Sequence, residues 1–583
     1  MSARLAGDFS RLGVSGPASV GQANGSVWCV AEGRIAGLSE LASDLGLDPA
    51  TPAEAVLAAA FSRQGEAMLD QLGGRFALIV WDGANETGLL AVDQLGSRSL
   101  FFHDNGGARL HFATEVRELV KLLPQEPGPD ESAVVSWFTS GTLEPDQTVF
   151  AGVRRLSGGC HLRLANGRWS LHRHWSPRFA TPERVTLEAA GLSVRKELER
   201  SVGERCAGQA TGVLLSGGLD STSVAAVAAG LGVTRLRAYS ALFPADASAD
   251  ESEFVALATQ GLGVPAVQQA TVAGGVLDAS AEHVRDWRLP AASPNLFFQR
   301  PLLERVRADG ATIVLDGQGG DELFACSPYL LADLLRGLRL KSLHARSREL
   351  AGGDPRGARA VRRTFALRGA APRWLRAAYF RLHRRPALHW LTPRAVALTT
   401  DARAPWLTLD GPRWWTWLAD TLTAGRERMG AHDHFRRQLA PEQLTGAHPL
   451  LDDLRLIETV LRLPPELAYD EDLDRPVLRQ GMRGLVPEPI RLRKTKSFFD
   501  NVLVDSLAGP DRPQLRGLLE PQDAEIRAYV TDERIRDVVD GPVAPERPFL
   551  WAMNAWRLAS TELWLRSLAS RTDLANGLDG PVS

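Results

Sequence analysis

The sequence predicts an α/β protein with a β-rich N-terminal domain followed by a domain built on a parallel sheet. Two patterns along the 583 residues carry this prediction. Up to about residue 180, short apolar runs alternate with turn residues, which is typical of stacked antiparallel strands. From about residue 185, strand, glycine-rich loop and helix alternate, which is typical of a parallel sheet with helices on both faces. A chain of this length exceeds one ordinary core, so more than one domain is expected.

Composition excludes several classes of protein. Hydrophobic residues make up 44% and charged residues 23% of the chain, as in globular rather than disordered or fibrous proteins. The formal net charge of −2 implies no overall attraction to nucleic acid or to an anionic membrane. The four cysteines lie far apart without metal-site spacing, and no apolar run resembles a signal peptide or a membrane span. We therefore expect a cytoplasmic protein with no nucleic-acid partner and no membrane partner.

The N-terminal domain is predicted to span residues 1–180. A helix is expected over 52–69, where apolar residues recur at three-to-four spacing. Further short strands are expected between 137 and 175, around a series of glycines, and the boundary is placed in the proline-containing segment 176–186. The first strands of this domain are predicted at Gly74–Trp81, Gly88–Asp93, Leu100–His103 and Leu110–Ala113.

The second domain is predicted to span residues 185–583. Strands are expected at 212–216, 235–243 and 311–316, with an alanine-rich helix to Ala229 and another helix from Glu251. A helical insertion is expected over about 330–430, and a further helix over 452–463. The arginine-rich part of the insertion, Arg336–Arg394, is interpreted as a packed helical layer with arginines facing water, although a patch for a peptide or partner protein is an open alternative.

The first candidate site is the segment SGGLDSTS, which begins at Ser216 between an apolar strand and a helix. Its two glycines allow a tight turn that aims backbone N–H groups, hydroxyls and the helix N-terminus at an anion such as pyrophosphate. A structural turn with a serine cap is the alternative. The segment lacks the lysine of the common phosphate-binding loop, so the Asp220 carboxylate is expected to hold Mg²⁺. The predicted nucleotide-binding residues are Leu215, Ser216, Gly217, Gly218, Leu219, Asp220 and Ser221.

A second glycine-rich loop, DGQGGDELF, begins at Asp316 after another apolar strand. Gly319 and Gly320 are expected to expose backbone amides to the nucleotide. Asp321 and Glu322 offer carboxylates for Mg²⁺ between phosphates; Asp321 is assigned to the metal and Glu322 to the catalytic residues. Loops that follow parallel strands lie at the same sheet edge, so the two loops should meet in one crevice. An acidic capping turn is the alternative interpretation.

The third candidate is the basic run RLRKTKSFFDN, which begins at Arg491. An enzyme that adenylates a carboxylate needs a fixed cation to offset charge on the α-phosphate and on the oxyanion that develops at the acyl carbon. Considered alone, this run is more easily explained as a solvated basic turn.

These segments, together with Pro449–Leu467 and in this order, resemble the synthetase domain of the asparagine synthetase family, which includes β-lactam synthetases and lasso-peptide cyclases. Upstream segments resemble the glutaminase-type domain of that family, so the resemblance covers nearly the whole chain. It implies an Ntn-hydrolase-like αββα sandwich followed by a pyrophosphate-loop α/β synthetase domain. It also implies ATP and Mg²⁺ as cofactors, with Asp220 and Asp321 bridging the magnesium. Lys496 is implied beside the acyl-adenylate, with Lys494 as a second candidate. The upstream segments are 69–82, 91–102, 111–120 and 141–159.

The sequence departs from the family pattern in its first domain. A working glutaminase of this family uses an N-terminal cysteine, whereas this chain begins Met1-Ser2-Ala3. The family's NGE-type segment is replaced by AEGRI at Ala31–Ile35. A serine nucleophile at Ser2 would lack the reactivity of a thiol and has no evident base. We therefore expect a degenerate domain that does not hydrolyse glutamine.

Without a glutaminase, the amine is expected to come from the substrate itself. A β-lactam synthetase would carry a tyrosine three residues before Asp321, where this chain has Gln318. The resemblance therefore favours a lasso-peptide cyclase, which closes a macrolactam between the N-terminal amine of a leader-cleaved core peptide and an Asp or Glu side chain. A leader-binding protein and a peptidase are the expected partners. The alternatives are an asparagine synthetase that uses free ammonia, a β-lactam synthetase, a tRNA-modifying pyrophosphate-loop enzyme and an inactive interaction protein.

Overall fold

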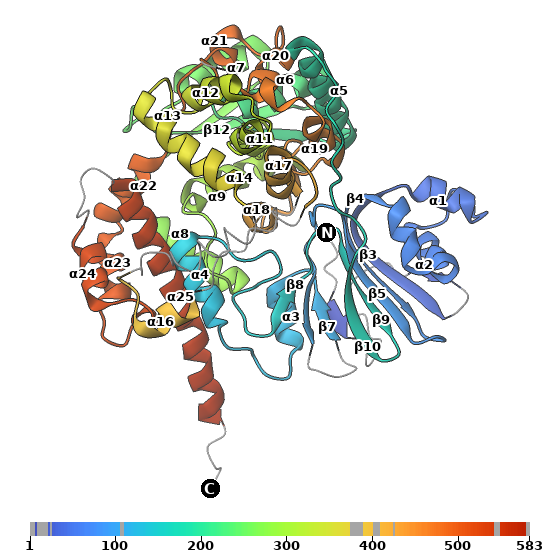
Figure 1. Cartoon of the computed structure of the whole chain (residues 1–583). Coiled ribbons are helices and arrows are strands. Elements are labelled where there is room, and N and C mark those ends of the chain that lie inside the picture. The colour runs from blue at the N-terminus through green and yellow to red at the C-terminus, as the bar shows by residue number, and fades with distance from the viewer. Residues whose placement is uncertain are drawn as a thin grey trace.

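The computed structural model describes residues 6–8, 21–23, 26–104, 110–372, 389–399, 409–423, 426–470, 472–541 and 548–578. They form an N-terminal body of two antiparallel sheets beside a larger body built around a parallel sheet (Figure 1). Ser2 and the parts 373–388 and 400–408 lie outside the described residues. No described helix is long and apolar enough to cross a membrane.

Two stacked sheets make the core of the N-terminal body. The six-stranded sheet has the order β10-β9-β5-β4-β3-β2, and the four-stranded sheet has the order β1-β7-β6-β8. The larger sheet comprises β2 (Gly21–Ala23), β3 (Val27–Ala36), β4 (Gly73–Asp82), β5 (Thr87–Val92), β9 (Cys160–Ala165) and β10 (Arg168–Arg173). The smaller sheet comprises β1 (Ala6–Asp8), β6 (Phe101–Asp104), β7 (Leu110–Ala113) and β8 (Val153–Arg155).

The period-two pattern of β4 explains why the sheets stack. Phe76, Leu78 and Val80 belong to the apolar cluster with α1 (Leu38–Asp44) and α2 (Ala53–Gln64). Ala77 and Ile79 point the other way, into the cluster shared with β6 and β7. The helices therefore cover one face of the larger sheet, and the smaller sheet covers its other face (Figure 1).

The four strands predicted in the first 113 residues are present as β4, β5, β6 and β7. The strands expected around Gly141 are not found there, because Glu131–Ser140 forms the helix α4, which ends at Gly141 in the left-handed conformation. Asp130 caps α4 by accepting the N–H of Ala133. The helix α3 (Val116–Leu122) precedes it and, with α4, contributes to an apolar cluster that also contains C-terminal residues.

The second body contains the predicted parallel sheet, with the order β13-β12-β11-β14-β15. All four pairings are parallel. Its strands are β11 (Thr211–Leu214), β12 (Arg237–Leu242), β13 (Ala266–Ala270), β14 (Ile313–Leu315) and β15 (Thr445–Ala447). Helices α5 (Leu187–Cys206), α6 (Leu219–Gly230) and α7 (Ser252–Leu262) contribute to its largest apolar core. The class prediction, α/β with a parallel sheet, is confirmed.

Helices account for most of the remaining described chain. The stretch expected to be helical between 330 and 430 forms α11 (Leu330–Arg336), α12 (Leu340–Glu349), α13 (Pro355–Val361), α14 (Arg368–Ala370), α16 (Pro393–Leu398) and α17 (Arg413–Thr423), with α18 (Arg426–Leu439) following. The helix α19 (Leu454–Leu461) matches the one predicted at 452–463. The helix α9 (Leu296–Ala308) packs on β12, and α8 (Val276–Trp287) packs on α9. The helix α20 (Pro476–Gly481) packs on α5, α21 (Glu488–Arg491) packs on α6 and α7, and α10 (Gly320–Leu323) follows β14.

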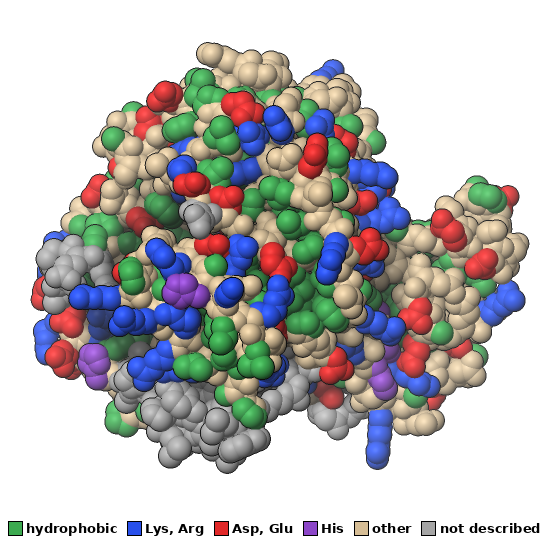
Figure 2. Space-filling model, turned by 45° about the horizontal axis from the view of Figure 1, so that its top comes forward, with side chains coloured by type: hydrophobic (Ala, Val, Ile, Leu, Met, Phe, Trp, Pro, Cys, Tyr) green, Lys and Arg blue, Asp and Glu red, His purple; other side chains and the backbone are tan. Residues whose placement is uncertain are grey.

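The C-terminal helices join the two bodies. They are α22 (Asp500–Ala508), α23 (Arg512–Leu519), α24 (Asp532–Asp540) and the long α25 (Pro548–Leu578). Trp564 of α25 packs edge-to-face on Phe150, with ring centroids 5.5 Å apart. In Figure 1, α25 runs past α4 and extends beyond the rest of the molecule. The face shown in Figure 2 carries acidic and basic side chains side by side over much of its area.

Candidate active site

The loop Leu215–Ser221 joins β11 to α6 and is held in shape by its own hydroxyls. The Ser216 N–H donates to Ser221 Oγ at 3.1 Å, and Ser221 Oγ donates to the Ser216 carbonyl at 3.1 Å. The Gly218 N–H donates to Ser216 Oγ at 3.3 Å. The Gly217 N–H donates to the Glu251 carboxylate at 3.2 Å, so this amide serves the loop itself. The donors left for an anion are therefore the first-turn amides of α6 rather than every amide of the loop.

The two glycine-rich loops meet backbone to backbone. A Cβ on Gly317 would lie 2.4 Å from the Ser221 nitrogen, and one on Gly320 would lie 2.6 Å from Asp220 Oδ1. The first approach is to backbone and therefore requires glycine at position 317, whereas the second is to the carboxylate end of the Asp220 side chain. The loops therefore share one crevice at the carboxyl ends of β11 and β14, as their positions after parallel strands predicted.

Asp220 and Asp321 share a single guanidinium. Arg475 Nη1 donates to Asp220 Oδ2 and, at 3.0 Å, to Asp321 Oδ1, which brings the two carboxylates to one nitrogen. Asp220 is 16% exposed and Asp321 53%. Burial raises the pKa of Asp220 to about 7, although Arg475 opposes the rise. Asp220 Oδ1 is buried and has no hydrogen-bond partner within the described chain.

The acidic pair suits Mg²⁺ held between protein and nucleotide. No group of three or more His, Cys, Asp or Glu side chains in the described residues is placed to hold a metal. A magnesium ion here would take carboxylate oxygens from Asp220 and Asp321 and its other ligands from phosphates and water, as Mg²⁺ at nucleotide sites does. The unpartnered Asp220 oxygen fits that role.

The basic run divides into residues with different surroundings. Lys496 Nζ pairs with Asp321 Oδ2, and Lys494 Nζ pairs at 2.9 Å with the exposed Asp472. Arg493, which the sequence did not single out, is 9% exposed. Its guanidinium donates to the Gly217 carbonyl at 3.0 Å and to Glu251 at 2.8 Å, and it lies 3.8 Å over the Phe254 ring. Arg493 and Glu251 therefore hold Gly217 from its C=O and N–H sides.

One cavity of about 370 Å³ gathers most of these groups. Asp220, Asp321, Lys494 and Lys496 line it together with Arg475, which the sequence analysis missed. Glu322 is exposed and is not among the lining residues, so its catalytic role stays a prediction without geometric support. Other predicted residues that line the cavity are Leu215, Ser216, Gly218, Leu219 and Ser221; Gly217, Gly319 and Gly320 shape the loops behind it.

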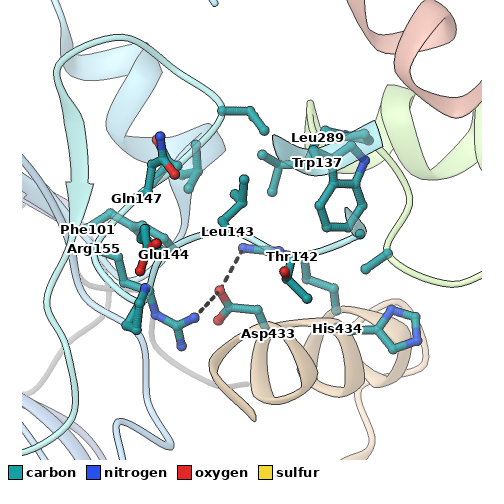
Figure 3. A pocket seen from close by; sticks show the side chains of 18 of the residues that line it. Phe101, Trp137, Thr142, Leu143, Glu144, Gln147, Arg155, Leu289, Asp433 and His434 are labelled. Carbon is teal, nitrogen blue, oxygen red and sulfur yellow. Dashed lines mark ion pairs between the residues drawn. The ribbon is translucent and has the colours of Figure 1, made fainter. Parts of the chain in front are cut away.

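A second cavity, of about 310 Å³, lies between the two bodies. In Figure 3, Phe101, Leu143, Leu289 and Trp137 surround it, and an ion pair between Arg155 and Asp433 closes one end. The two side chains of that pair lie 3.4 Å apart.

His434 on the wall of this cavity predicts a loss of stability in acid. It is 7% exposed, and burial, reinforced by Arg437, lowers its pKa to about 4. An unfolded histidine has a pKa near 6.5, so between about pH 6.5 and 4 the unfolded chain binds this proton more readily and acidification favours unfolding. At pH 4.5 the contribution is on the order of 2–3 kcal/mol. Urea unfolding at pH 7.5 and 4.5 measures it. Other titrating groups are common to wild type and His434→Gln, so equal pH dependence in the two proteins would contradict the assignment.

Comparison with known proteins agrees with this geometry. Residues 193–566 match the family model described as asparagine synthase, and residues 11–175 match the one described as a glutamine amidotransferase domain. A Mycobacterium bovis protein named as a glutamine-hydrolysing asparagine synthetase is 29% identical over 286 residues, 46% of this chain and 42% of that protein. Amidase chyE of Penicillium rubens is 28% identical over 51% of this chain and 46% of its own. Asparagine synthetase [glutamine-hydrolyzing] 3 of Bacillus subtilis is 23% identical over 74% and 68%. The alignments with the first two span less than half of those relatives.

Proposed function

The chain belongs to the asparagine synthase family, and from this premise we propose that it forms an amide bond by activating a carboxylate with ATP. The family matches pair a synthetase domain with an N-terminal domain of the Ntn-type glutamine amidotransferase class. The proposed reaction passes through an acyl-adenylate and releases pyrophosphate and AMP.

The observation that carries this proposal is the contact between the two loops. Gly317 and Gly320 bring Asp321 beside Asp220, and Lys496 pairs with Asp321 in the same cavity. Anion donors, two carboxylates for one magnesium and a cation therefore line the same cavity, which is what a triphosphate that loses pyrophosphate requires.

Each group has a role in the proposed mechanism. The first turn of α6 binds the departing pyrophosphate, and bound Mg²⁺ would supply charge neutralisation on the phosphates. Arg493 and Glu251 keep Gly217 in place, so the loop need not reorganise during the reaction. Lys496 provides the cation beside the acyl carbon when the amine attacks. Arg475, which pairs with both carboxylates and lines the same cavity, would offer its guanidinium to phosphate oxygens.

The finer proposal is that the substrate is a peptide, closed into a macrolactam between its N-terminal amine and an Asp or Glu side chain. Two features support it. Gln318 lines the cavity where a β-lactam synthetase would carry tyrosine. The AEGRI segment on β3, which stands in place of the family's NGE-type segment, makes structural contacts: Glu32 lies 3.8 Å from Arg98, and Arg34 donates to the Glu204 carbonyl of α5. A first domain that does not release ammonia from glutamine would leave the substrate to supply its own amine. We further propose a leader-binding protein and a peptidase as partners.

The test is incubation of the purified enzyme, Mg-ATP and linear core peptides that differ in the position of their Asp or Glu. The expected product is lighter than the substrate by one water and resists aminopeptidase, because its N-terminus is in the ring. The nucleotide product should be AMP. ADP would contradict adenylation, and an uncyclised peptide in every reaction that forms AMP would contradict the peptide assignment.

Asparagine synthesis is the second candidate, because the relatives from Mycobacterium bovis and Bacillus subtilis carry that name. Aspartate and ammonium, offered in place of the peptide, would then give asparagine and AMP. Glutamine in place of ammonium tests the N-terminal domain, which is expected to release no glutamate. The arms of this experiment share one enzyme preparation, so they decide between the candidates directly.

A further inference from the structure

The turn 446–452, which begins within β15 and ends just before α19, supports the acidic loop from behind. His448 Nδ1 lies 2.8 Å from Asp316 Oδ2, and Asp316 Oδ1 accepts the Gln318 N–H at 3.1 Å. Gly319, in the left-handed conformation with φ 90°, packs so closely on Leu451 that a Cβ would lie 2.7 Å from the Leu451 Cα. The loop that carries Asp321 is therefore shaped against this turn.

An arginine of the N-terminal body holds the same turn. Arg75 on β4 donates to the Gly446 carbonyl at 3.2 Å and to Asp452 Oδ2 at 2.8 Å, so it contacts both ends of the turn. Arg205 of α5 donates to the other Asp452 oxygen at 2.9 Å. Burial alone would raise the pKa of Asp452, but Arg75 and Arg205 hold it well below its usual range. This carboxylate is buried and charged, so loss of one arginine leaves it incompletely paired.

The N-terminal body also reaches His448 from a second direction, through α18. Phe435 of α18 lies against the His448 ring, with centroids 5.2 Å apart. The residues beside Phe435 are bound by N-terminal side chains: Glu115 pairs with Arg437 at 3.2 Å and also with Arg436, and Arg155 pairs with Asp433. His448 is thus held between two buried ionic contacts across the domain interface.

We propose that the N-terminal domain is a positioning element of the synthetase site, and that Arg75 acts through the turn 446–452, with His448 and Leu451 setting the loop of Asp321. Its kinetic readout rests on the proposed function, whereas its structural readout does not. An N-terminal domain that does not hydrolyse glutamine would then still have a structural role. Without it, the turn 446–452 would lose the Arg75 contacts, and the loop that carries Asp321 would lose its support.

The experiment compares Arg75→Gln with Arg34→Gln in the full chain. Both remove an interdomain arginine contact from the N-terminal body, but Arg34 donates to the Glu204 carbonyl on α5 and itself contacts neither the turn 446–452 nor the loop 317–323. Hydrogen exchange of the amides of 317–323 should be about tenfold faster or more in Arg75→Gln and unchanged in Arg34→Gln. The kcat/KM for ATP in ATP–pyrophosphate exchange should fall about tenfold or more in Arg75→Gln only.

The outcomes are separable. Unchanged protection of 317–323 in a folded Arg75→Gln protein overturns the inference, whatever the activity. Faster exchange confined to the loop supports it even if wild type lacks pyrophosphate exchange, a result that would instead contradict the proposed function. If Arg75→Gln does not fold, Arg75→Lys keeps the charge but loses the geometry of the Gly446 and Asp452 contacts, and the same loop amides decide. Adding Asp452→Asn should restore part of the loop protection, because it removes the buried charge that Arg205 alone pairs incompletely.

Discussion

Replacement of Asp321 or Asp220 by alanine is expected to lower the rate of ATP–pyrophosphate exchange about a thousandfold or more. Each change removes one of the two carboxylates proposed to bridge the magnesium. Asp220 is the more buried of the two, and among the described residues its Oδ1 has no hydrogen-bond partner that could replace a metal ion. Initial rates at saturating Mg-ATP, measured for both variants, test this expectation.

Two further variants sharpen the comparison. Asp532→Ala removes an exposed carboxylate that pairs with Arg527, far from the loops, and should leave the rate within about twofold of wild type. Glu322→Ala removes the carboxylate next to Asp321 that does not line the cavity. A large loss in Glu322→Ala would support its predicted catalytic role, and wild-type exchange in Asp321→Ala would show that the metal is held elsewhere.

Replacement of Lys496 by alanine is expected to reduce amide formation about a hundredfold or more while ATP binding stays nearly unchanged. The ammonium is proposed to offset charge that develops on the oxyanion and the α-phosphate, so its interaction is strongest in the transition state. Lys496→Arg should recover only part of the rate, because a planar fork does not reproduce a compact ammonium. Product formation from the linear peptide and equilibrium binding of ATP measure the two effects separately.

Lys494 provides the matched control. It lies two positions away and lines the same cavity, but it pairs with Asp472, which is 76% exposed. Lys494→Ala should therefore cost less than about tenfold, as expected for a solvated ion pair. The reverse order, with Lys494→Ala the more damaging change, would transfer the catalytic assignment to Lys494.

The sequence by itself determined the class of fold and which loops form the candidate site. The loops at Ser216 and Asp316 each follow a buried strand, and their glycines were recognisable because a tight turn before a helix is a local requirement. The strands β4 to β7 were recognisable for a similar reason, since apolar runs between turn residues encode them locally. The edge strands β13 and β15 were missed: two glutamines interrupt the apolar residues of β13 (AVQQA), and β15 has only three residues.

Only the tertiary structure decided which charges surround the site. Arg475 lies 255 positions from Asp220, Arg493 lies 276 positions from Gly217, and Arg75 lies 377 positions from Asp452. A charged residue has no periodicity of its own, and its sequence neighbours do not reveal which distant partner it meets. The same cause explains Glu322, which adjoins Asp321 in sequence but does not line the cavity. Local backbone chemistry therefore placed the loops, whereas the packing of distant segments selected the ion pairs that hold them.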